Sequence, residues 1–163
     1  MRVASFDIVF QEIPGEVTLA LNLSGCPCHC PGCHSQHLWE DVGESLDEPL
    51  LDGLLDRYGS QITCVCFMGG DQDPDYVARM AEHVQRLTTG SVPKQSLKTA
   101  WYSGRPAEPK SCGMDLNMFD YVKFGPYIES LGGLKSPTTN QRFYRREAGE
   151  WQECTALFQK STL

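Results

Sequence analysis

The residues with the clearest potential for chemistry are four cysteines that lie within eight residues, from position 26 to position 33. Three of them, Cys26, Cys30 and Cys33, have the spacing C-x3-C-x2-C, with which a flexible loop can turn three thiolates toward one metal centre. A cubane iron–sulfur cluster requires four ligands, so three protein sulfurs leave one iron open. An open position is where a metal site does chemistry, as in catalytic zinc sites. The spacing therefore predicts a 4Fe–4S cluster whose fourth iron binds a small molecule.

A zinc-stabilised binding module without catalysis is the alternative. Cys28, His29 and His34 could act as extra ligands, and short tracts rich in cysteine and histidine do bind zinc. Zinc sites more often pair two C-x2-C halves, and this chain shows a single such pair with a loop of its own. Cys28 lies two residues from both Cys26 and Cys30, which is an awkward spacing for a fourth ligand to the same cube. We therefore interpret Cys28 as a bystander.

The residues around the cysteines resemble the cluster loop of radical S-adenosylmethionine (SAM) enzymes. A Ser-Gly pair directly precedes Cys26, a Pro-Gly pair separates Cys30 from Cys33, and His34 and Trp39 follow. Within that superfamily the segment is most similar to the activating proteins of anaerobic (class III) ribonucleotide reductase, which also tend to have glycine before the third cysteine. The resemblance extends from about residue 14 to residue 141, and the cysteine loop is its most specific part.

The elements that must position this loop can be predicted from apolar patterns. Residues 17–23 form a largely apolar segment of high strand propensity that leads directly into the cysteine loop. The loop should therefore lie at the carboxyl end of a buried strand, where α/β folds place their sites. Further strands are expected at residues 3–10, 61–67, 97–102 and 119–124, helices at residues 47–59 and 73–90, and a C-terminal hairpin at residues 143–154.

Two segments that follow expected strands are candidates for ligand binding. Gly69 and Gly70 allow close backbone approach and positive φ, so their N–H and C=O groups can meet a polar ligand; a tight turn is the alternative reading. The resemblance implies that Gly69, Gly70 and Asp71 bind the amino group of the methionine moiety of SAM, with Asp71 replacing a glutamate. It also implies that Ser103, which follows the next strand, lies beside the ribose and carboxylate of SAM.

The chain departs from the family pattern in two places. Relatives have Gly-Pro-Gly-x-Arg before the strand at residues 17–23, whereas this chain has Ile-Pro-Gly-Glu at residues 13–16 and lacks the arginine. Phe124 stands where relatives have an aspartate, so no SAM contact is transferred to it. Residues 138–142 resemble a Ser-Ser-Asn-Gln segment of the activases and either line a substrate mouth or turn the chain.

Composition excludes several classes of protein. The length of 163 residues favours one domain, residues 1–163, and a hydrophobic content of 40% argues against disorder. The net charge of −7 gives no basic surface for nucleic acid, and no apolar stretch approaches the length of a membrane span. The N-terminus also lacks the apolar core of a signal peptide.

The remaining cysteines are scattered. Cys64 and Cys66 alternate onto one face of an expected strand, which favours small buried hydrophobes over an auxiliary metal site. Cys112 and Cys154 have no partner at ligand spacing. This distribution fits metal binding in a reducing cytoplasm better than a secreted disulfide framework, so a cytoplasmic protein is expected.

The resemblance as a whole implies an α/β fold, namely an open, incomplete (βα) barrel of the radical-SAM type with mostly parallel strands, extended by the C-terminal hairpin. It implies an oxidoreductase in which the cluster cleaves SAM to methionine and a 5′-deoxyadenosyl radical, and that radical removes hydrogen from a glycine of the reductase. The implied partners are the large subunit of anaerobic ribonucleotide reductase and reduced flavodoxin or a similar electron donor. No proton-transfer residue is needed, so no catalytic side chain is predicted. An activase of another glycyl-radical enzyme, or a radical SAM enzyme acting on a small molecule, is the alternative.

Overall fold

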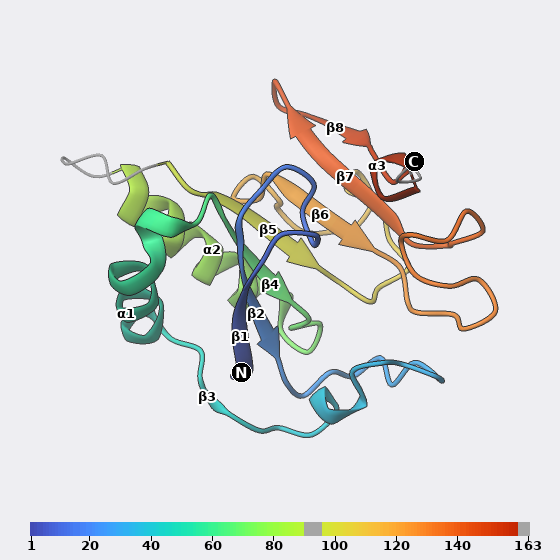
Figure 1. Ribbon diagram of the computed structural model, residues 1–163, viewed down its shortest axis with the longest axis horizontal. Coiled ribbons are helices and arrows are strands. Elements are labelled where there is room, and N and C mark those ends of the chain that lie inside the picture. The colour runs from blue at the N-terminus through green and yellow to red at the C-terminus, as the bar shows by residue number, and fades with distance from the viewer. Residues whose placement is uncertain (90–95, 160–163) are drawn as a thin grey trace.

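Eight strands of the computed structural model form one sheet, in the order β3-β1-β2-β4-β5-β6-β7-β8 (Figure 1). The structure describes residues 1–89 and 96–159. The strands are β1 Arg2–Val9, β2 Thr18–Leu23, β3 Glu44–Ser45, β4 Cys64–Met68, β5 Lys98–Tyr102, β6 Tyr121–Phe124, β7 Arg142–Glu147 and β8 Glu150–Glu153. The helices are α1 Glu48–Tyr58, α2 Pro74–Thr89 and the short α3 Ala156–Gln159, with single 3₁₀ turns at Gln36–Leu38 and Gly59–Gln61. Gly90, where the sequence predicts the end of the second helix, lies outside the described residues.

The expected barrel with mostly parallel strands is wrong. Strands β2, β4, β5 and β6 pair in parallel, but the other four of the seven pairings are antiparallel. A parallel pair needs a long crossover, which α1 and α2 supply between β2, β4 and β5 and an irregular segment supplies between β5 and β6, whereas β7 returns beside β6 in the antiparallel direction. The chain therefore forms an open mixed sheet whose parallel centre is flanked by antiparallel strands on both sides.

The two longer helices begin where the sequence predicts them. The carboxylate of Asp47 accepts a hydrogen bond from the Leu50 N–H at 2.9 Å and caps α1, while Asp73 does the same for Tyr76 at 3.0 Å in the first turn of α2. Both helices cover the same face of the sheet, and Figure 1 shows them side by side. None of the helices in the described part of the chain has the length and apolar character needed to cross a membrane.

The core has a large cluster under the helices and a smaller one on the opposite face. Trp101, Phe67 and Phe119 are completely buried in the larger cluster. The smaller cluster consists of Ile13, Cys64, Cys66, Ala100, Tyr121 and Phe143. The prediction that Cys64 and Cys66 are buried on one face is confirmed, and burial raises the pKa of both thiols. The β7–β8 hairpin, also predicted, extends the sheet beyond this cluster.

A charge network around the buried Glu16, at the amino ends of the parallel strands, was not visible in the sequence. The Glu16 carboxylate accepts hydrogen bonds from Lys98 Nζ at 2.5 Å, Tyr121 Oη at 2.6 Å and Thr63 Oγ1 at 2.6 Å. Burial alone would raise the pKa of Glu16, but these hydrogen bonds outweigh it and hold that pKa below its ordinary value. The network joins the segments just before β2 and β4 to the first residues of β5 and β6, at the end of the sheet opposite the cysteine loop.

Glu16→Gln is expected to reduce the acid sensitivity of the fold. A carboxyl group with a lowered folded-state pKa stabilises the protein above its unfolded pKa of about 4.3, and this contribution is lost as the pH falls below that value. We expect the variant to be less stable by about 2 kcal/mol at pH 7, since it loses charged hydrogen bonds. Urea unfolding at a series of pH values should show the difference shrinking below pH ~4. A difference that stays constant down to pH ~3 would contradict this.

Candidate metal centre

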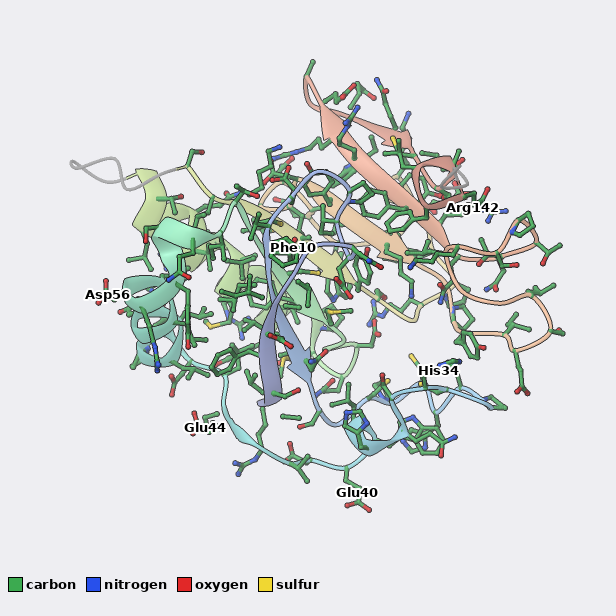
Figure 2. All side chains as sticks on the ribbon, in the orientation of Figure 1. Phe10, His34, Glu40, Glu44, Asp56 and Arg142 are labelled. Carbon is green, nitrogen blue, oxygen red and sulfur yellow. The ribbon has the colours of Figure 1, made fainter. Side chains whose placement is uncertain are left out.

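The cysteine loop leaves the sheet at the carboxyl end of β2, as predicted. Its base is closed by backbone hydrogen bonds from Gly25 N–H to Glu40 O at 3.1 Å and from Cys26 N–H to Leu38 O at 3.0 Å. Ser24, fully buried, donates its hydroxyl to Val42 O at 2.6 Å. Figure 2 shows this loop projecting from the sheet, with His34 on it and Glu40 on the returning arm. The Ser-Gly pair therefore fixes the two arms from which the cysteines project.

The thiols of Cys26, Cys30 and Cys33 are free and half-buried. The Cys33 N–H donates to Cys30 O at 3.0 Å, and the Ser35 N–H donates to Cys33 Sγ at 3.4 Å. Among the described residues, no three His, Cys, Asp or Glu side chains already have the arrangement of a metal site. The donors nevertheless fit an iron–sulfur cluster, because they are soft thiolates on one loop and one of them already accepts a backbone N–H.

Two histidines that a zinc site could use have aromatic partners. The His29 ring stacks on Trp39 with centroids 4.7 Å apart, and His34 Nε2 lies 3.2 Å from Tyr127 Oη. Cys28, interpreted from the sequence as a bystander, instead points toward the ends of the neighbouring strands. Its Sγ donates to Asp71 Oδ2 at 3.8 Å. Burial raises the pKa of the Cys28 thiol to about 12, and the charges of Asp71 and the adjacent cysteines add to this.

The segment after β4 lies against the end of β5. Gly69 and Gly70 have φ values of 102° and 87°, and a side chain at Gly70 would come within 2.4 Å of Val77. The Trp101 indole N–H donates to Gly69 O at 2.8 Å. The two glycines therefore form a turn, and the hydrogen bond from the buried Trp101 side chain fixes the position of its backbone.

Asp71 and Ser103, predicted separately, are brought together. Asp71 is buried and accepts hydrogen bonds from Ser103 Oγ at 2.5 Å and from Gly104 N–H at 2.8 Å, and Arg105 Nε lies 3.7 Å from it. Gln72 donates to Ser24 O at 2.8 Å and so ties this segment to the base of the cysteine loop. The four predicted ligand-binding residues and the cysteine loop thus occupy one end of the parallel strands.

Lys123 is a buried cation at the same end that the sequence analysis missed. Its Nζ donates to Ser103 O at 3.2 Å and Gly125 O at 3.0 Å and lies over the Tyr102 ring. Burial lowers the pKa of Lys123 to about 8, while the charges of Asp71 and of the cysteines Cys30, Cys28 and Cys26 oppose that shift. The sequence feature that could have revealed it is a lysine in a short, otherwise apolar strand, on the same face of that strand as Tyr121.

Side chains of residues 138–142 hold the segment that follows β6 in place. Asn140 Nδ2 donates to Pro126 O at 2.9 Å, and the Gln141 side chain donates to Gly125 O at 3.5 Å. Asn140 and Arg142 also line a surface cavity of about 660 Å³ together with Phe124. The segment therefore turns the chain, as one of its two predicted roles has it, and its role at a substrate mouth stays a prediction.

The family described as 4Fe-4S single cluster domain matches residues 14–130. This range covers more than half of the chain and includes the cysteine loop, the Gly-Gly-Asp segment, Ser103 and Lys123. No curated protein and no solved structure matches the chain.

Proposed function

The chain belongs to the 4Fe-4S single cluster domain family, and on that premise we propose that it is a radical SAM activase of anaerobic ribonucleotide reductase. In this proposal Cys26, Cys30 and Cys33 hold a 4Fe–4S cluster. The cluster supplies the electron that cleaves SAM to methionine and a 5′-deoxyadenosyl radical, which makes a glycyl radical on the large subunit of the reductase. Reduced flavodoxin or a similar protein is the proposed electron donor.

One observation carries the proposal, namely that the cysteine loop meets the Asp71–Ser103 pair at the ends of β2, β4 and β5. A contact of 3.8 Å between Cys28 and Asp71 joins the two segments. A small molecule bound there can touch both an open iron and the polar strand ends. This is the arrangement that a cluster with three cysteine ligands needs if its fourth iron is to act on a bound molecule.

The chain's own residues would orient that molecule. The backbone of the Gly69-Gly70 turn can approach a ligand closely because neither residue carries a side chain. Asp71 supplies a fixed carboxylate for an amino group, and Ser103 and Gly104 hold that carboxylate in place. Lys123 supplies a buried positive charge that favours an anionic group nearby. A site so organised binds both charged ends of an amino acid moiety.

The substrate is proposed to be a protein rather than a small molecule. In the described part of the chain every strand belongs to the one sheet, and the described residues form no separate substrate-binding domain. We therefore expect a complex with the reductase large subunit that forms in the presence of SAM. Size-exclusion chromatography of the two proteins with SAM tests this, and two separate peaks at micromolar concentration would contradict it.

Cleavage of SAM is the experiment that tests the proposed function. Anaerobic reconstitution with iron and sulfide, chemical reduction and addition of SAM should give equal amounts of 5′-deoxyadenosine and methionine. The same sample with the reductase large subunit should show a glycyl radical by electron paramagnetic resonance (EPR). Formation of 5′-deoxyadenosine without that radical would favour another glycyl-radical enzyme or a small molecule as substrate. A colourless protein that binds only zinc would refute the proposal.

Lys123→Met is expected to make the cluster harder to reduce. Reduction adds negative charge to a cluster, and a buried cation in its vicinity stabilises that charge. At an effective dielectric constant of about 20, a nearby unit charge contributes on the order of 1 kcal/mol or more, which corresponds to a decrease of some tens of millivolts in the potential of a one-electron couple. EPR-monitored redox titration should show this decrease, whereas Lys110→Met, at an exposed lysine, should leave the potential unchanged. Equal potentials would exclude a role for Lys123 in tuning the cluster.

A further inference from the structure

Cys28 faces the side of the cysteine loop on which the proposed ligand would bind. Its Sγ lies 3.8 Å from Asp71 Oδ2, and a methyl group built on Gly104 would come within 2.7 Å of that sulfur. Asp71 and Gly104 belong to the ends of β4 and β5. The thiol therefore occupies space that exists because Gly104 has no side chain.

Cys28 is also close to two of the predicted cluster ligands. It lies two residues from Cys26 and two from Cys30 on the same loop. A small molecule that touched both a cluster on this loop and the strand ends would lie beside Cys28, whose Sγ contacts Asp71 at the end of β4. Cys28 is thus the thiol placed to reach the open iron from the ligand side.

We propose that Cys28 is the fourth thiolate ligand of the cluster while no small molecule is bound, and that the small molecule displaces it. Binding forms one Fe–S bond, breaks the S–H bond and releases the proton to water, with no change of oxidation state. Displacement breaks that Fe–S bond and returns a proton to the sulfur. The second half of the proposal rests on the proposed function, whereas the first half requires only the cluster.

The sequence spacing explains why such a ligand would be displaceable. Cys28 is separated by one residue from Cys26 and by one from Cys30, and the intervening His29 already has a φ of 43°. A non-glycine residue with positive φ stores backbone strain, so there is little freedom to improve the geometry of Cys28 toward the cube. A strained thiolate binds more weakly than the other three, yet it still shields an iron that would otherwise bind water.

Differential alkylation of the full-length protein tests the proposal. The metal-free protein, the cluster-loaded protein and the loaded protein with excess SAM are treated with iodoacetamide under anaerobic conditions, at a pH and for a time that clearly label Cys28 in the metal-free protein, and each cysteine is quantified by peptide mass spectrometry. We expect labelling of Cys28 to fall at least about tenfold on cluster loading and to recover with SAM. Cys112, whose thiol is engaged with backbone carbonyls in the 105–118 segment, is the internal control and should not change. Labelling of Cys28 at the metal-free rate in the loaded protein would overturn the proposal.

A variant supplies a second readout. In Cys28→Ala, oxidation with ferricyanide in the absence of SAM should give several times more of the three-iron cluster, seen by EPR, than in wild type, and SAM should remove the difference. Equal yields in the two proteins would overturn the proposal. If the variant does not load a cluster, the alkylation of the wild-type protein decides alone.

The outcomes also separate this proposal from the proposed function. Formation of 5′-deoxyadenosine in a sample whose Cys28 is never protected overturns the ligand role alone. Protection of Cys28 that SAM does not reverse overturns the displacement. If a sample in which SAM does not reverse the protection of Cys28 also forms no 5′-deoxyadenosine, both the displacement and the proposed SAM chemistry are refuted.

Discussion

Cys33→Ala is expected to lower the iron and sulfide bound after reconstitution at least about tenfold. The variant keeps Cys26 and Cys30 together with Cys28, whose proposed bond to the cluster is weak and displaceable, so only two strong ligands remain to hold four irons against loss to solvent. Cys33 gives the clearest test, because Cys28 lies two residues from Cys30 and could replace it as a ligand. Cys33 Sγ also accepts the Ser35 N–H, so its removal disturbs the loop beyond the loss of a ligand.

Colorimetric iron and sulfide assays and the visible absorption of the cluster measure the effect. Cys112→Ala, which removes a thiol from the 105–118 segment, should load the same amount of iron as wild type. Circular dichroism of the two metal-free variants should be alike, because the half-buried Cys33 side chain contributes little to the core. A Cys33→Ala protein with a full complement of iron would exclude Cys33 as a ligand and would remove the basis for an open iron.

The parts of this protein that could be predicted from sequence are those specified by local patterns. The apolar run at residues 17–23 predicts β2 and places the cysteine loop at its carboxyl end, and Asp47 and Asp73 mark the starts of the two helices. These features depend on neighbours in the chain. Strand direction depends on partners far away, which is why the predicted barrel is an open mixed sheet instead.

The segments on either side of β6 show the reason for that error. The prediction recognised the segment between β5 and β6 as irregular, yet it kept the barrel that the family resemblance implied. β6 pairs in parallel with β5 without a crossover helix, and the chain then returns as β7 beside β6 in the antiparallel direction. The direction of β7 is set by its pairing with β6 and not by a local pattern, so the end of the parallel series could not be predicted from the sequence.

The site residues missed from sequence are those whose role depends on a distant segment. Lys123 is an ordinary lysine in a short strand until its neighbours Ser103 and Gly125 are known. Cys28 was interpreted as a bystander from its spacing alone, but the structure places it against Asp71, 43 residues away in the chain. Both residues make contacts that no local sequence pattern records, and the role of Cys28 as a ligand stays a proposal.

Asp71→Ala is expected to reduce both the stability of the metal-free protein and its affinity for SAM. The carboxylate is buried and satisfies the Ser103 hydroxyl and the Gly104 N–H, and it faces Arg105. Alanine leaves those donors without an acceptor in a water-poor site, which costs about 2–4 kcal/mol of unfolding free energy. It also releases the end of β5 from the segment after β4, so the two halves of the proposed ligand site are no longer fixed relative to each other.

The variant Asp71→Asn separates the effect on stability from the effect on SAM affinity. Asp71→Asn keeps an acceptor for one donor, so we expect it to lose less unfolding free energy than Asp71→Ala. It also loses the negative charge, so we expect its affinity for SAM to fall at least about tenfold, nearly as much as in Asp71→Ala. Urea denaturation gives the stabilities, and equilibrium dialysis of cluster-loaded protein with labelled SAM gives the affinities. Glu82→Ala, a change at an exposed position of α2, should alter neither. If both Asp71 variants bind SAM as wild type does while losing stability, Asp71 is a structural brace between two strands, and the amino group of the ligand must be bound elsewhere.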